Sequence, residues 1–256
     1  MNEPPFPTVR AAAASQLLIS AGLPKSGSTW LHNLQNALSE AAGWGRWQEV
    51  QQAFFPEHAW FPYVEDLRPV HLVGLLLPVL HGRSYCIKVH CPPHPAVLRL
   101  LGSGLARATY IFRDPRDCVL SCLEAGAQAR AAGNPAGQAF AELDSMEKAV
   151  EFVAGFAEGA MLWAALPGVH FVRYESLLDA PFAEMQKMRA YLGLAVEDEA
   201  LREIVGRFDG GRGVATFNKG GAGRFRAAFS TLEIARLNER FAQFMRTTGY
   251  PDDPAG

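Results

Sequence analysis

The segment 22–29, which reads GLPKSGST, constrains the fold of this chain more than any other. It follows the apolar run 17–22 and precedes a helical pattern over 27–42. Its two glycines permit a tight turn and a close approach of the backbone to an anion. A helix that begins here would direct the N–H groups of residues 26–29 at a phosphate. The order of strand, glycine loop and helix therefore predicts an anion-binding loop in an α/β fold.

The loop lacks the lysine that nucleotide triphosphate-binding loops carry. In GxxxxGK[ST] the lysine follows the second glycine and reaches the β- and γ-phosphates. Here Ser28 takes that place, and Lys25 comes three residues earlier. This arrangement gives a long polyphosphate little support. It suits a lysine placed over the bridge between one phosphate and a neighbouring group.

Short apolar runs alternate with longer helical patterns along the chain, which predicts βαβ units, a parallel sheet and helices on both of its faces. The predicted strands are 17–22, 84–89, 108–113 and 169–174. The predicted helices are 27–42, 95–104, 115–131, 145–165, 181–192, 197–207 and 231–247. The stretches 43–80 and 209–230 are less regular and are expected to be loops. Ligands of such sheets bind at the carboxyl ends of the strands.

The length allows one large α/β domain or two small ones. Because no linker-like shift in composition interrupts the alternation of elements, we expect one three-layer α/β domain over residues 1–256, with 1–15 and 250–256 peripheral. The net charge of −2 gives no overall field for nucleic acid or an anionic membrane. No apolar stretch reaches the roughly 20 residues of a membrane span. The four cysteines lack zinc-type spacing and are expected to be reduced, so a cytoplasmic location is predicted.

The segment PKSGSTW, residues 24–30, resembles the PKSGTTW loop of the sulfotransferases that use 3′-phosphoadenosine 5′-phosphosulfate (PAPS). In that family the loop holds the 5′-phosphosulfate, the lysine neutralises charge at the bridging oxygen, and the tryptophan lies near the adenine. The resemblance implies that PAPS is the co-substrate and that 3′-phosphoadenosine 5′-phosphate (PAP) is the product. The binding residues that it implies in this loop are Lys25, Ser26, Gly27, Ser28, Thr29 and Trp30. A core role for Trp30 is the alternative.

A second segment, YIFRDPRDCVLS at 110–121, resembles the motif that holds the 3′-phosphate in the family. The corresponding residues are Arg113 at the end of a strand and Ser121 on the next helix. A guanidinium offers a forked set of donors to a phosphate, and a hydroxyl completes the shell. The alternative is an ion pair of Arg113 with Asp114 or Asp117 at the start of the helix.

A third segment, FNKGGAGRF at 217–225, resembles the RKGxxGDWK segment that closes over the 3′-phosphate. Lys219 and Gly220 match, whereas Asn218 replaces the arginine and Arg224 the aspartate. Arg212 or Arg224 is the candidate for the missing charge. The alternative is a glycine-rich surface loop.

The segment VRYESLL, residues 172–178, resembles a strand-ending segment whose tyrosine contacts the adenine. Tyr174 is the corresponding residue, with a core tyrosine as the alternative. Thr216 is a further candidate for contact with the adenine.

The segment IKVHCPPH, residues 87–94, resembles the KTHLP segment whose histidine is the catalytic base of the family. His90 is the corresponding base, and imidazole titrates near working pH. Lys88 and Lys25 would stabilise charge on the sulfuryl oxygens and the leaving phosphate. A zinc site on His90 and His94 is not expected, because the two prolines between them disfavour a helix and no third ligand is evident.

The acceptor is predicted to be a hydroxyl of a small molecule, hydrophobic alcohol or phenol, and a carrier-bound hydroxyl stays open. Its pocket is expected among the aromatic residues of 44–63 and in 122–145, although these aromatics equally suit a core. The segment 225–240 does not reproduce the KxxxTVxxxE dimer motif of animal cytosolic members, so no oligomeric state is predicted.

These motifs together predict a PAPS-dependent sulfotransferase that needs no metal. The first alternative is a P-loop kinase for a small molecule, which would need a Mg²⁺-binding acid at a strand end. The second is a nucleotide-binding homologue without activity, suggested by Asn218 and Arg224 in the third segment.

Overall fold

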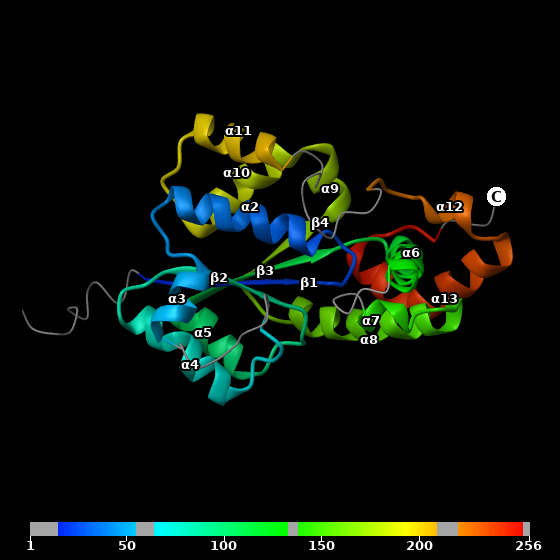
Figure 1. The fold of residues 1–256 in the computed structure, drawn as a ribbon, viewed down its shortest axis with the longest axis horizontal. Coiled ribbons are helices and arrows are strands. Elements are labelled where there is room, and N and C mark those ends of the chain that lie inside the picture. Colours follow the sequence, from blue (N-terminus) through cyan, green and yellow to red (C-terminus); the bar gives the residue numbers. More distant parts are fainter. Residues whose placement is uncertain (1–14, 55–63, 133–137, 209–219, 253–256) are drawn as a thin grey trace, which may run out of the picture.

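The computed structural model describes residues 15–54, 64–132, 138–208 and 220–252. A sheet of four parallel strands lies at its centre (Figure 1). The strands are β1 (Leu17–Gly22), β2 (Tyr85–Val89), β3 (Ala106–Phe112) and β4 (Val169–Arg173), and their order is β2-β1-β3-β4. All four coincide with predicted strands to within two residues.

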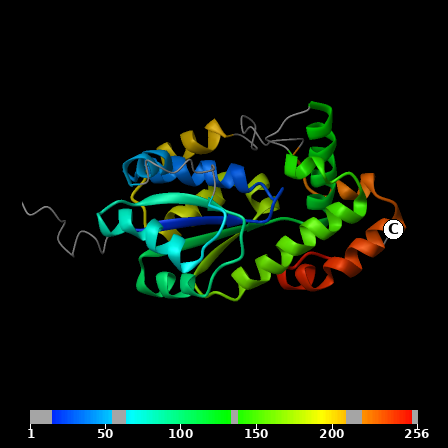
Figure 2. The same cartoon turned by 60° about the horizontal axis from the view of Figure 1, so that its bottom comes forward.

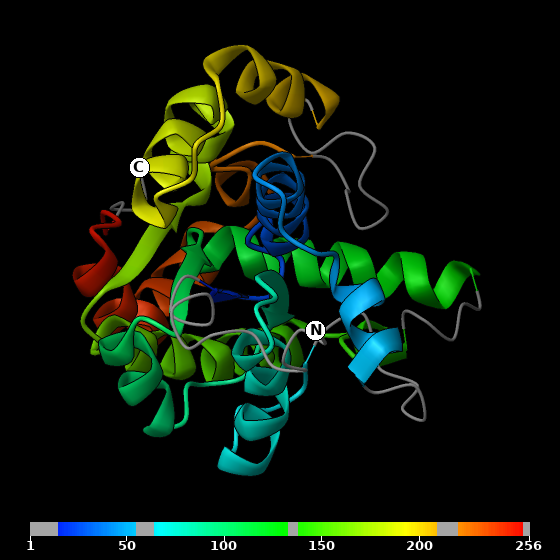
Figure 3. The same cartoon turned by 90° about the vertical axis from the view of Figure 1, so that its left-hand side faces the viewer.

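Helices cover both faces of the sheet, as predicted (Figures 1 and 3). One face carries α2 (Ser28–Ala41), α9 (Tyr174–Asp179), α10 (Pro181–Leu192) and α11 (Asp198–Arg207). The other carries α3 (Trp47–Phe54), α4 (Pro69–Leu80), α5 (Ala96–Ser103) and α8 (Met146–Ala164). Beyond the carboxyl ends of the strands lie α6 (Pro115–Ala132), α7 (Gln138–Ala141) and α12 (Phe225–Ala228). The helix α13 (Thr231–Thr248) packs against α8 and α6 (Figure 2).

Alternation along the buried strands divides the core into two clusters. Leu17 and Ile19 of β1 point into the larger cluster with α8, whereas Leu18 between them points into the cluster under α2 and α10. This is the period of two that a strand imposes, and because both faces are covered, every residue of β1 is buried. Helices therefore pack against both faces of the sheet, and this packing holds in place the loops that follow the carboxyl ends of the strands.

The expectation that 43–80 is a loop is wrong for its described residues, because they form α3 and α4. The sequence of α4, PVHLVGLLLPVL, is apolar almost all round, so it shows no period of 3.6. The helix α3 is only eight residues long. The second irregular stretch, 209–230, also contains a helix, the short α12.

Of the segment 250–256, predicted to be peripheral, residues 250–252 are described, and Tyr250 is less peripheral than predicted. Tyr250 is buried and its hydroxyl donates to Glu175 Oε2 at 2.6 Å. The fully buried Arg116 donates to both carboxylate oxygens of Asp114 and to the carbonyl oxygen of Pro251. The residues after α13 are thus fastened to α9 by Tyr250 and to the start of α6 by the bond from Arg116 to Pro251.

All four cysteines are free thiols, as expected. Across the described ranges, no helix combines the length and the apolar composition needed to cross a bilayer.

Candidate active site

The predicted anion loop joins β1 to α2 through two residues in the left-handed region. Lys25 has φ 65° and Gly27, the N-cap of α2, has φ 84°. A Cβ on Gly27 would lie 2.7 Å from Cδ2 of Tyr174, so a side chain does not fit there. The first N–H groups of α2 lack partners within the helix and carry its positive dipole end. The loop thus has the shape and the polarity of an anion site.

Ser26 departs from the expectation that its N–H points at a phosphate. Its backbone N–H donates to the carbonyl oxygen of Leu23 at 3.2 Å, and its hydroxyl donates to the same oxygen at 2.5 Å. The side chain is fully buried. Ser26 therefore shapes the turn from inside the loop.

The carboxyl end of β2 brings Lys88 and His90 to the loop, as their position after a strand predicted. Lys88 Nζ donates to Thr29 Oγ1 at 2.6 Å. Burial and the nearby charge of Lys25 lower the pKa of Lys88 to about 8. Burial also lowers the pKa of Lys25 itself. The loop is thus lined by desolvated cations whose charge an anion would stabilise.

His90 is oriented by the backbone of the loop. Its Nδ1 lies 2.8 Å from the carbonyl oxygen of Gly22, a distance at which Nδ1–H donates. Burial, and next the charge of Lys88, lower the pKa of His90 to about 4. The imidazole is therefore neutral near pH 7, with Nε2 as its basic nitrogen.

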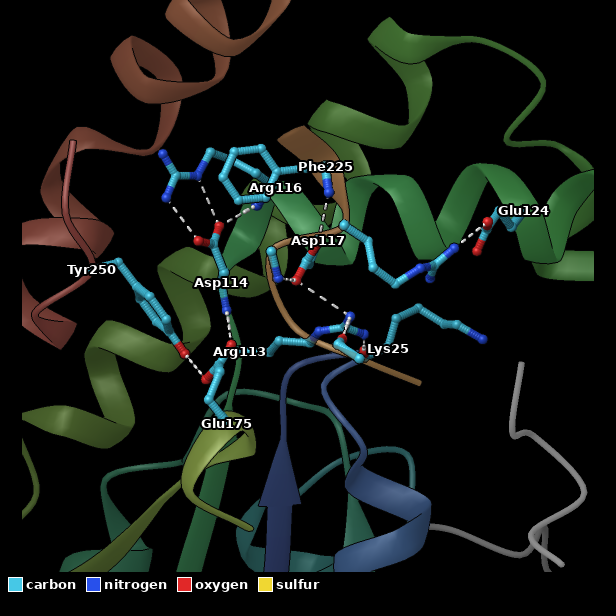
Figure 4. A network of polar contacts seen from close by, with 12 residues as sticks. Lys25, Arg113, Asp114, Arg116, Asp117, Glu124, Glu175, Phe225 and Tyr250 are labelled. Atoms are coloured by element: carbon cyan, nitrogen blue, oxygen red, sulfur yellow. Dashed lines mark hydrogen bonds and ion pairs between the residues drawn. The ribbon is translucent and has the colours of Figure 1, made fainter. Parts of the chain in front are cut away.

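Arg113 connects three segments of the site (Figure 4). Its Nη1 donates to the carbonyl oxygen of Lys25 at 3.2 Å, and its Nη2 donates to that of Gly221 at 2.7 Å. Its guanidinium lies 4.5 Å from the ring centre of Tyr174. The ion pair with Asp117 that the sequence offered as an alternative is also present, at 3.4 Å. Among the described residues, Arg113 Nε and Trp30 Nε1 are buried without an acceptor, so the site holds unused donors.

Trp30, Tyr174 and Ser121 lie in the interior around the loop. Trp30 packs edge-on against Tyr174, with ring centres 6.3 Å apart. Tyr174 opens α9 instead of ending β4 as predicted, and belongs to the core cluster under α2. Ser121 lies two turns along α6 from Arg113 and is also buried. Their contacts with a nucleotide remain predictions.

The third predicted segment is described only from Gly220 onward; Thr216, Asn218, Lys219 and Arg212 lie outside the described residues. We call residues 220–224 the late loop. Its glycines 220, 221 and 223 all have positive φ, a conformation that few other residues adopt. Arg224 forms an ion pair with Glu124 of α6. Its charge is therefore paired with an acid, and the hypothesis that it replaces the missing phosphate-binding charge stays a prediction.

The aromatic residues next to the site come from α7 and α8. Phe140, from the predicted region 122–145, has Lys25 Nζ 5.2 Å from its ring centre. Phe140, Phe152 and Phe156 form a continuous row, with ring centres 5.8 Å and 5.0 Å apart, and Phe156 meets His90 edge-on. We call these three phenyl groups the aromatic row. All three are half-buried. Sequence reasoning missed Phe152 and Phe156, although their spacing of four marks one helix face.

The segment 44–63 does not supply the expected pocket in its described part. Trp47 stacks on Tyr85 with ring centres 5.6 Å apart, and both are buried. Tyr85 opens β2, whereas His90 follows its other end. Phe55, Trp60, Phe61 and Tyr63 lie outside the described residues.

His94 has a structural contact: its Nδ1 accepts the backbone N–H of Ala96 at the start of α5. In the described part of the chain, no three metal-ligating side chains come together as a cluster.

The sequence model of the family described as "Sulfotransferase domain" matches residues 15–209. This is most of the chain, and the chain belongs to the sulfotransferase family. The prediction of a sulfotransferase, made from the resemblance of the phosphate loop, is confirmed. The match decides against the small-molecule kinase.

Solved structures show the same fold. Mouse sulfotransferase SULT7A1, crystallised with PAP, aligns with a TM-score of 0.58 and 17% identity over 92% of this chain and 85% of its own. Retinol dehydratase in complex with androsterone and PAP gives 0.54 and 16%, over 91% and 81%. A putative steroid sulphotransferase of Arabidopsis thaliana gives 0.50 and 19%, over 92% and 78%.

Gly27→Ala should weaken binding of PAP by more than tenfold, because the new methyl group would displace Tyr174 and the N-terminus of α2. The control is Gly43→Ala: Gly43 has nearly the same φ, 83°, but nothing lies within 4 Å of its Cβ position. In this variant only the free energy of unfolding should fall, by roughly 1–2 kcal/mol, because alanine is strained in the left-handed conformation. Calorimetric titration with PAP and thermal melting measure both. Equal PAP affinity in the two variants would contradict the assigned loop.

Proposed function

We propose that the chain transfers the sulfuryl group of PAPS to a hydroxyl of a small, hydrophobic acceptor, with His90 as general base. In this reaction the acceptor oxygen forms a bond to sulfur while the bond from sulfur to the bridging phosphate oxygen breaks. PAP leaves with that electron pair, and the hydroxyl proton passes to His90 Nε2. The family and the complexes of its relatives with PAP support PAPS as the donor.

The observation that carries the proposal is the orientation of His90. A hydrogen bond from Nδ1 to the carbonyl oxygen of Gly22 selects the tautomer in which Nε2 is the base. The same carbonyl belongs to the last residue of β1, where the phosphate loop begins. The base is therefore fixed to the element that would bind the phosphosulfate. A positioned base typically contributes about 10² to 10⁴ in rate.

Lys25 and Lys88 supply positive charge on the donor side. Lys88 is held at the first turn of α2 by Thr29, and burial with mutual repulsion lowers its pKa. An incoming phosphosulfate would relieve that repulsion and favour both ammonium groups in the charged form. Charge that develops on the bridging oxygen as the bond to sulfur breaks would then be stabilised.

The aromatic row supports an apolar acceptor. Phe156 contacts His90 edge-on and Phe140 contacts Lys25, so the row spans the distance between the base and the loop lysine. Its half-buried rings offer apolar surface to an acceptor whose hydroxyl faces His90 Nε2. A polyanionic sugar would instead require a basic lining, which phenyl groups do not provide.

His90→Ala should abolish sulfuryl transfer while leaving PAP affinity within about twofold of wild type. The reason is that proton removal depends on His90, whereas the loop and Arg113 bind the nucleotide without it. Transfer is measured with ³⁵S-labelled PAPS and a panel of alcohols, phenols and carrier-bound hydroxyls, and affinity by titration with PAP. A variant that retains turnover would remove His90 as the base. Binding of PAP without transfer by the wild type to any acceptor would favour the inactive homologue.

The pH dependence of kcat/KM should be bell-shaped, with a lower limb near pH 4 and an upper limb near pH 8. His90 must be neutral to accept a proton, so activity falls as pH drops through its lowered pKa. Lys88 must be charged, so activity falls as pH rises through its lowered pKa. An aliphatic alcohol, which does not titrate here, is the suitable acceptor. In Lys88→Arg the upper limb should move to higher pH, and an unmoved limb would exclude Lys88 as its source.

Phe152→Ala should raise the KM for a hydrophobic phenol by roughly tenfold, because burial of a phenyl group contributes about 1.5–3 kcal/mol. PAP affinity should not change. The control, Phe171→Ala, removes a partly exposed phenyl group from β4 and should leave both constants unchanged. Steady-state kinetics and PAP titration measure these quantities. An unchanged KM in Phe152→Ala would exclude the aromatic row as the acceptor wall.

A further inference from the structure

Two acidic side chains of α6 hold the late loop and the residue after it. The fully buried Asp117 accepts the N–H of Gly223 on Oδ2 at 2.7 Å and the N–H of Phe225 on Oδ1 at 3.0 Å. Glu124 forms the ion pair with Arg224, and both side chains are about one-fifth exposed. Because Asp117 and Glu124 are seven residues apart, they lie on one face of the helix. The late loop is thus fastened at two points along α6 (Figure 4).

Arg113 connects the same loop to the phosphate loop. Its two terminal nitrogens donate to the carbonyl oxygens of Gly221 and Lys25, which are 196 positions apart in the chain. Asp117 also lies 3.4 Å from Arg113 Nη2, so one carboxylate orients both the guanidinium and the loop. The placement of Arg113 therefore depends on where α6 holds the late loop.

The charge at position 224 is opposite to that of the motif that the segment resembles. Where that motif has an aspartate, this chain has Arg224, and Glu124 on α6 provides the opposite charge. Glu124 also acts on Lys25: burial lowers the pKa of that lysine, and the negative charge of Glu124 offsets a small part of the lowering. The pair thus fastens the late loop and lies within electrostatic reach of the phosphate loop.

We propose that Asp117 and the Glu124–Arg224 pair are positioning residues that hold the late loop and Arg113 for recognition of the 3′-phosphate of the donor. We call these three residues the clasp. The inference rests on PAPS as the donor and on Arg113 at its 3′-phosphate. A displaced late loop takes the carbonyl of Gly221 away from Arg113, which leaves the guanidinium without its orientation. Affinity for PAP should fall, whereas affinity for adenosine 5′-phosphosulfate, which lacks the 3′-phosphate, should change little.

The variant Glu124→Arg distinguishes positioning of the late loop from a direct effect of charge on PAP affinity. Added positive charge near the loop would strengthen binding of any anion, whereas loss of the clasp should weaken PAP by roughly fivefold. The double variant Glu124→Arg, Arg224→Glu restores an opposite pair and should recover most of the affinity. Glu151→Arg is the matched control, because it makes the same change of charge at an exposed pair with Arg240 between α8 and α13. Titration with PAP and with adenosine 5′-phosphosulfate gives the selectivity for the 3′-phosphate.

Asp117→Asn tests the buried half of the clasp. The amide keeps the volume of the side chain but presents a donor to the N–H of Gly223 or Phe225, so PAP affinity should fall by about tenfold. Thermal melting shows whether the variant folds, and the Glu124 variants test the clasp in either case. The clasp is overturned if Glu124→Arg binds PAP as tightly as wild type, or if the double variant is no better than Glu124→Arg. PAP binding needs neither an acceptor nor His90, so failure of the clasp and failure of the proposed transfer are distinguishable.

Discussion

The buried guanidinium of Arg113 is the interaction on which the rest of the site depends. An unpaired charge in this environment would be strongly destabilising, and a paired one is tolerated only when its remaining donors are satisfied. Asp117 supplies the charge, two backbone carbonyls accept the terminal N–H groups, and the ring of Tyr174 faces the guanidinium. Three segments far apart in the chain meet at this one group. The Nε–H is buried without an acceptor among the described residues.

The phosphate loop is arranged so that its cations disfavour one another until an anion is present. Lys88 reaches the first turn of α2, the charge of Lys25 acts on it, and burial removes the water that would screen these charges. The lowered pKa values of both lysines and of His90 have this common cause. A bound dianion reverses the effect on the lysines, because opposite charge favours the ammonium form. Burial, and next the charge of Lys88, also keep His90 neutral, which a base requires.

The sequence predicted the parts of the fold that have a local signal. The four strands follow from short apolar runs, and the placement of Lys25, Lys88 and Arg113 follows from their position at or just beyond the carboxyl ends of strands. The helix α4 is not predicted, because a helix that is apolar on all sides shows no period of 3.6 residues. Tyr174 is predicted at the end of a strand, because no break in the sequence separates β4 from α9. The contact of Asp117 with the late loop joins residues more than 100 positions apart, and no local pattern indicates it.

For the aromatic residues, too, the local sequence does not show whether a side chain lies in the core or at the site. Trp47 and Phe140 lie in the two regions where the sequence predicts either a core or a pocket, since apolar side chains serve both. The strand β2 separates the two roles, because Tyr85 opens it and His90 follows its other end. Trp47 follows Tyr85 into the core, whereas Phe140 joins the row that reaches His90.

The lysine missing from the phosphate loop is replaced by one from the neighbouring strand. In a triphosphate-binding loop the position of Ser28 would carry a lysine that extends along the β- and γ-phosphates. Here Lys88 reaches the first turn of α2 from β2 and is held there by Thr29, the residue directly after Ser28. Lys25 lies at the head of the loop, and its charge acts on Lys88. Two cations that act on one another beside a helix N-terminus are suited to a phosphate with one charged neighbour.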